Sequence, residues 1–148
     1  MGRLVCLSVC LLFTVNAAHA SGVKAVDDQK INELELRAEH AQPQEQCYLY
    51  AQLVSQMGQV ADQQLASGDE AKAEKTLARM QRYTSRIHQT LGPRDKKLKE
   101  SEILVRQTAR RVDSMFHQAA LEQQEMLRGA LQRLNALQAE MMLAVFQH

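Results

Sequence analysis

Residues that favour β-strands are scarce in this chain, and so are residues that interrupt helices. Aromatic side chains make up only 4% of the 148 residues, and tryptophan is absent. The chain has just two prolines and six glycines, whereas alanine, glutamine, leucine, glutamate, arginine and lysine dominate. These abundant residue types favour helices, while aromatic and β-branched residues favour strands. The composition therefore predicts an all-α protein, which we expect to be an antiparallel bundle of four to five helices.

The short motifs that mark common active sites are also missing from the sequence. It contains no Glu-x-x-His, His-x-x-x-His or Cys-x-x-Cys spacing, each of which would bring metal ligands together. A glycine-rich phosphate loop, a dinucleotide-binding fingerprint and the Gly-x-Ser-x-Gly motif are absent as well. Asp113 and His117 stand one helical turn apart, but two ligands make a weak metal site, and we favour a surface hydrogen bond. We therefore expect no enzymatic activity, no cofactor and no metal.

The beginning of the chain has the parts of a cleavable signal peptide. Arg3 supplies a short cationic start, and residues 4–15 form a mostly apolar run that is too short to span a bilayer. Ala18 and Ala20 are the small residues that a signal peptidase pocket admits, which predicts cleavage after Ala20. We therefore interpret residues 1–20 as a signal peptide and expect an exported protein, either periplasmic or secreted.

Cleavage would leave a mature chain of one domain's size, without a transmembrane segment. We expect a flexible N-terminal segment at 21–26 and a single helical bundle domain at 27–148. Lipid attachment at Cys10 is an alternative, but Val9 is branched where a small residue is needed. Retention of the apolar run as a membrane anchor is the other alternative.

Cysteine is rare in the remainder of the chain. Cys6 and Cys10 lie within the expected signal peptide, so the mature protein keeps Cys47 alone and cannot form an internal disulfide. Cys47 shares a helical stripe with Ala51 and Val54, and no neighbouring base would activate its thiol. We therefore expect a buried thiol that packs as a small apolar side chain.

Glycine and proline lie where helices are expected to end. A first helix should run from an N-cap at Asp27 or Asp28 to a break before Pro43, because proline disfavours helical geometry in the preceding residue. The next two helices are expected at about 45–67 and 70–91, with Gly68 and Gly92-Pro93 after their last turns.

In the segment 95–146 the apolar residues keep a single helical periodicity and no proline interrupts them, so the segment could form one long helix or two. Polar residues around Gln123 interrupt the apolar stripe, and a single rod would leave its second half uncovered. We favour a turn between about 117 and 125, after which the last helix folds back into the bundle. A continuous rod that dimerises as a coiled coil remains the alternative.

Opposite charges are sorted along the chain. Arg3 is one of the 18 basic residues and leaves with the signal peptide, so the mature chain has 17 basic and 17 acidic residues. Residues 27–70 carry mostly acids and residues 72–111 mostly bases, and the two segments could neutralise one another or leave the basic one free. Five cations fall in a narrow sector opposite the apolar stripe of the helix at 70–91 and form a ridge. They are Lys72, Lys75, Arg79, Arg82 and Arg86.

These patterns favour an exported interaction module that binds protein or self-associates. The alternative is an anion-binding protein that uses the basic segment 72–111. Outside the cytosol its partner would be anionic lipid or polysaccharide rather than nucleic acid, and binding should weaken steeply with salt.

Overall fold

The computed structural model describes residues 19–147, and within this range the backbone forms helices, turns and short connections with no strand. The all-α prediction is thus confirmed. Five helices follow one another in the described residues, and their bounds are α1 (His19–His40), α2 (Pro43–Ala66), α3 (Glu70–Thr90), α4 (Leu98–Gln118) and α5 (Leu121–Phe146).

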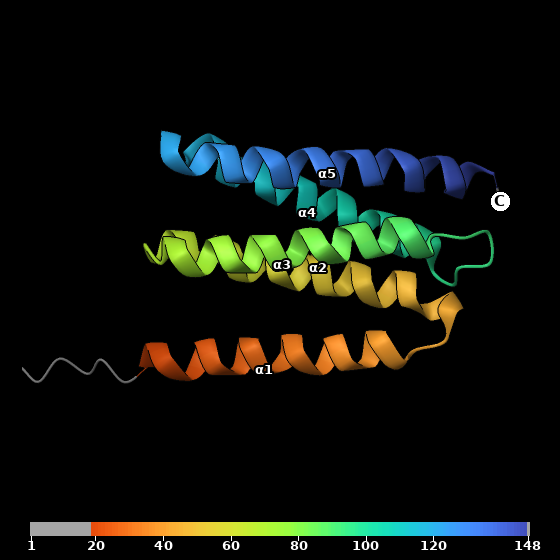
Figure 1. Ribbon diagram of the computed structural model, residues 1–148, viewed down its shortest axis with the longest axis horizontal. Coiled ribbons are helices and arrows are strands. Elements are labelled where there is room, and N and C mark those ends of the chain that lie inside the picture. Colours follow the sequence, from red (N-terminus) through yellow and green to blue (C-terminus); the bar gives the residue numbers. More distant parts are fainter. Residues whose placement is uncertain (1–18, 148) are drawn as a thin grey trace, which may run out of the picture.

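The helices are arranged as two stacked hairpins with one additional helix on the outside (Figure 1). The hairpin α2–α3 lies beside the hairpin α4–α5, so that α2 packs on α4 and α3 packs on α5. Helix α1 packs on α2, on the side away from the second hairpin. Consecutive helices run antiparallel, as expected for an up-and-down bundle.

A glycine in left-handed geometry closes the first hairpin. Gly68 has φ +75, and the Asp69 amide N–H donates to the carbonyl of Gln64 at 2.8 Å. The Gly68 amide donates to the carbonyl of Leu65 at 3.0 Å, which completes a Schellman cap. The helix bounds on both sides of this turn lie close to those expected.

The long C-terminal pattern is divided into two helices. Ala119 and Ala120 are extended, with ψ 149 and ψ 158, and the chain then reverses into α5. Helix α5 packs on α4 and α3, so the expected turn is confirmed and the continuous rod is excluded.

Helix α1 begins earlier than the sequence analysis indicated. Its backbone is helical from His19, so the expected N-cap at Asp27 or Asp28 is wrong, and the segment 21–26 is helical. No proline lies between His19 and the end of the helix, and a helix interior tolerates aspartate at a cost below about 1 kcal/mol.

Most of the expected signal peptide, residues 1–18, lies outside the described residues. Side chains before residue 28 are likewise not described. In the described part of the chain, no helix combines the length and the apolar character needed to cross a membrane.

The core lies between the two hairpins and beneath α1. Its largest fully buried side chains include Leu53 and Met57 of α2, Leu77 of α3 and Leu134 of α5. Gly58 allows α2 to approach α4 closely, because a Cβ atom at this position would lie 2.9 Å from Thr108 Cγ2.

Candidate functional site

The cationic ridge on α3 is partly neutralised within the molecule. Lys72, in the first turn of α3, forms an ion pair at 2.7 Å with Asp69, the residue just before this helix. Arg79 reaches across to α1, where it pairs with Glu35 and donates to the side-chain oxygen of Asn32 at 2.9 Å. The acidic first helix thus satisfies one member of the ridge.

Among residues 28–147, the other three ridge cations have no such partner. Lys75, Arg82 and Arg86 are exposed and form no ion pair with any of residues 28–147. Tyr83, between them, is buried and donates its hydroxyl proton to Glu35. The ridge therefore keeps three positive charges that no side chain of residues 28–147 neutralises, beside the contact between α3 and α1.

Cys47 lies in the core near the start of α2, with 0% of its surface exposed. Burial, and to a smaller extent the nearby Asp95 carboxylate, raise the pKa of the Cys47 thiol to about 12. A thiol of this kind holds its proton at neutral pH. Because the thiolate is the reactive form, the position is unsuited to nucleophilic chemistry.

The pair with metal-ligand spacing lies on the surface of α4. Asp113 Oδ1 and His117 Nε2 are 3.5 Å apart, and both side chains are exposed. Within the described residues, no three His, Cys, Asp or Glu side chains come together as a metal site would require. The pair is an exposed contact between neighbouring helical turns.

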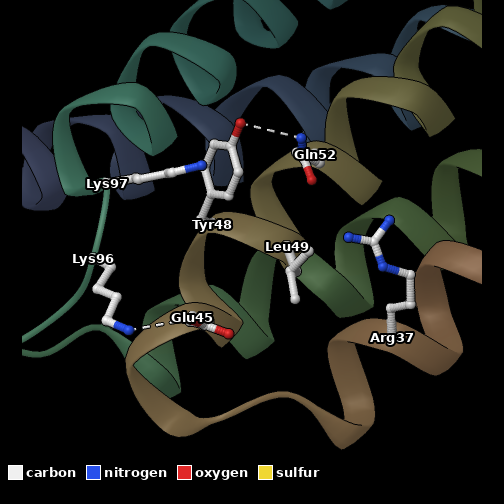
Figure 2. Close-up of a pocket in the computed structure, with 7 residues that line it drawn as sticks. All are labelled: Arg37, Glu45, Tyr48, Leu49, Gln52, Lys96 and Lys97. Atoms are coloured by element: carbon white, nitrogen blue, oxygen red, sulfur yellow. Dashed lines mark hydrogen bonds and ion pairs between the residues drawn. The ribbon is translucent and has the colours of Figure 1, made fainter.

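A pocket that the sequence analysis missed lies where the end of α1, the start of α2 and the segment before α4 meet (Figure 2). Its volume is about 410 Å³. We call it the α1–α2 pocket, and its lining residues are Arg37, Glu45, Tyr48, Leu49, Gln52, Lys96 and Lys97.

The connection between α3 and α4 brings the two pocket lysines to α2. The Lys96 amide donates to the carbonyl of Gln44 at 2.8 Å, which ties this connection to the first turn of α2. The Lys97 ammonium lies over the Tyr48 ring, 4.5 Å from its centroid. Sequence reasoning could not bring these lysines to Arg37, because they are distant along the chain and nothing local relates them.

A second feature that the sequence analysis missed is an exposed apolar stripe at the end of α5. Met142, Leu143 and Phe146 are 42%, 66% and 82% exposed, although each is large and apolar. Ala139 is exposed on the same side of the helix, one turn earlier. We call these four residues the C-terminal stripe.

No known protein family, curated protein or solved structure matches this chain. Three surface features of the described residues are candidates for its function. They are the cationic ridge, the α1–α2 pocket and the C-terminal stripe.

Proposed function

We propose that the protein is an exported, non-enzymatic helical interaction module that self-associates through the C-terminal stripe. The observation that carries this proposal is the exposure of Met142, Leu143 and Phe146 on one side of α5. Their spacing is the one by which helices pack against each other, and large apolar side chains in a cluster mark interaction sites. The export part of the proposal rests on the pattern of residues 1–20.

A second copy of this chain is the partner that the charge distribution favours. Between residues 134 and 147, Glu140 is the single charged side chain, and its Oε2 lies 2.6 Å from Nδ1 of His88. Two identical C-terminal stripes can therefore meet about a two-fold axis without like charges opposing each other. Helix α5 also forms one outer edge of the bundle, so its end is accessible to a neighbour (Figure 1).

The size of the C-terminal stripe sets the strength of this contact. Residues 139–146 cover about 12 Å along the helix axis. Four side chains on each copy bury much less than the roughly 1,200 Å² at which stable interfaces begin. Self-association should accordingly be weak, reversible and dependent on concentration.

Sedimentation velocity across a range of protein concentrations tests this proposal. The mean mass of the native protein should rise with concentration, whereas Leu143→Ser combined with Phe146→Ser should remain monomeric. Leu121→Ser is the matched control, because Leu121 is also on α5 and is 81% exposed but lies at the opposite end. A native protein that stays monomeric, or an equal effect of Leu121→Ser, would contradict self-association through this stripe.

Anion binding by the ridge is the second candidate function. It is favoured by the three exposed cations Lys75, Arg82 and Arg86, which lack ion-pair partners among residues 28–147. Their partner would be a surface that carries many negative charges, such as anionic lipid or polysaccharide. The vesicle measurement described below separates this function from binding in the pocket.

A further inference from the structure

We propose that the α1–α2 pocket binds a phosphate monoester group. This site is distinct from both the C-terminal stripe and the α3 ridge. The proposal rests on the charge of the pocket, on the availability of its cations and on the backbone geometry of Lys97.

The charge of the pocket matches that of a phosphate monoester. Arg37, Lys96 and Lys97 contribute three positive charges and Glu45 one negative charge, which leaves a net charge of two positive. A phosphate monoester carries about −1.5 to −2 at pH 7, whereas a carboxylate carries a single charge. The volume of about 410 Å³ leaves room for a small organic group beside the phosphate.

The three cations are available to a ligand. Arg37 forms no ion pair with residues 28–147, and its guanidinium lies across the pocket from the two lysines (Figure 2). Lys96 pairs with Glu45 at 3.2 Å, but both side chains are exposed, and pairs of this kind are weak enough to exchange for a stronger anion. A guanidinium on one side and ammonium groups on the other suit the several oxygens of a phosphate.

Neutral groups complete the lining. Gln52 donates its amide to the Tyr48 hydroxyl at 3.1 Å, which leaves the hydroxyl proton of Tyr48 free to donate to a ligand oxygen. Leu49 is buried and supplies an apolar contact. The pocket therefore offers both charged donors for a phosphate and neutral contacts for the group attached to it.

Lys97 has a backbone geometry that lysine rarely adopts. Its φ is 57 and its ψ is 36, and among the described residues it is the one position other than glycine with a positive φ. Glycine would adopt this geometry without strain. Strained backbone of this kind concentrates at binding sites, and here it accompanies an ammonium group placed over the Tyr48 ring.

Calorimetric titration of the purified protein with glycerol 3-phosphate, at low ionic strength and pH 7.5, tests the proposal. We expect saturable binding that weakens at least tenfold in Arg37→Gln and in Lys97→Gly. The thermal midpoint of Lys97→Gly should be equal to or above that of the native protein, because glycine relieves the strained backbone. Loss of affinity with retained stability would separate a binding role of Lys97 from a structural one.

Arg82→Gln is the matched control, because Arg82 is an exposed cation outside the pocket. It should leave the affinity for glycerol 3-phosphate unchanged. Affinity for this probe should also fall between pH 7.5 and 5.5, because the phosphate loses its second charge near pH 6. Absence of binding, unchanged affinity in both pocket variants, or an equal loss in Arg82→Gln would overturn the proposal.

Vesicles distinguish a soluble ligand from a lipid headgroup. Phosphatidic acid presents a phosphate monoester, and phosphatidylglycerol presents a diester with one charge. Glycerol 3-phosphate binding without retention on either vesicle indicates a soluble ligand, while retention on phosphatidic acid alone, lost in Arg37→Gln, indicates a headgroup. If the protein is retained on both vesicles and retention requires Arg82 and Arg86, the ridge is the binding surface. If, in addition, glycerol 3-phosphate does not bind, the pocket proposal is overturned.

Discussion

At Gly58, helix α2 of the first hairpin approaches helix α4 of the second so closely that there is little room for a side chain. A Cβ atom there would lie 2.9 Å from Thr108 Cγ2, a buried and branched side chain that has little room to move. Gly129 on α5 is the opposite case, because a Cβ atom there would meet nothing within 4 Å. The same substitution at these two helical positions should therefore have opposite effects.

Gly129→Ala should stabilise the fold by about 0.5–1 kcal/mol, since alanine loses less backbone entropy in a helix. Gly58→Ala should destabilise it by about 1 kcal/mol or more, because overpacking costs about 1–3 kcal/mol and exceeds the gain in helix propensity. Urea unfolding measures both changes. Adding Thr108→Ser to Gly58→Ala removes the clashing methyl and should recover stability, and an equal gain in both single variants would contradict the close approach of α2 and α4.

The buried thiol of Cys47 makes stability depend on pH at alkaline values. Its pKa is about 12 in the folded chain, against an ordinary value of 9.0, because burial and Asp95 disfavour the thiolate. The unfolded chain therefore loses this proton first as the pH rises. The protonated thiol makes its full contribution to the free energy of unfolding below about pH 9, and this contribution is lost as the pH rises from 9 to 12.

We expect the free energy of unfolding to fall by about 1 kcal/mol per pH unit above pH 9 because of this group. Urea unfolding at pH 8 and at pH 10.5 measures the fall. Cys47→Ala is the control, because it keeps every other titrating group, including the tyrosines. The fall should be smaller in Cys47→Ala, and equal falls in the two proteins would show that the thiol is not the cause.

At the scale of the helices, local signals located most boundaries. Gly68 and Gly92-Pro93 follow helices whose ends lie within a residue or two of the expected ones. The break between α4 and α5 contains neither glycine nor proline, and it was predictable because polar residues near Gln123 interrupt the apolar stripe. The start of α1 was not predictable in this way, because Asp27 and Asp28 are good N-caps that here lie inside a helix.

The candidate sites were less accessible to sequence reasoning than the helices. The ridge on α3 follows from the periodicity of one helix, and so does the exposure of Arg82 and Arg86. The α1–α2 pocket depends instead on the path of the connection between α3 and α4, which brings Lys96 and Lys97 beside α2. Tertiary packing decides that path, and a linear pattern does not contain it.

Across the whole molecule, the acidic and basic segments of the chain lie side by side. Among the described residues, four ion pairs join the acidic segment 27–70 to the basic segment 72–111. Asp69 pairs with Lys72 at the start of α3, and the other three pairs link residues distant along the chain: Glu35 with Arg79, Glu45 with Lys96 and Asp62 with Arg111. Ion pairs at or near the surface contribute only about 0–1 kcal/mol each, so together they add little to stability. The stability of the bundle must come mainly from its apolar core.

Helix α5 is the element that closes this core. It contributes Leu127, Leu134, Leu137 and Met141, all of which are buried, and it packs on both α3 and α4. Without α5, the parts of α3 and α4 that it covers would face water. The fold should therefore unfold as a unit when the contact made by α5 is broken.

Leu134→Asp tests this dependence, because Leu134 has 0% of its surface exposed and the new carboxylate would have no water around it. Burial of an unpaired charge belongs to the substitutions that cost more than about 4 kcal/mol, and a domain of this size has only about 5–15 kcal/mol in total. We expect Leu134→Asp to abolish the cooperative thermal transition, as monitored by circular dichroism. Asn135→Asp is the matched control, since it adds the same charge at the next, exposed residue and should leave the transition in place. A Leu134→Asp protein that remains folded and merely loses self-association would mean that α5 serves the interface between copies rather than the core.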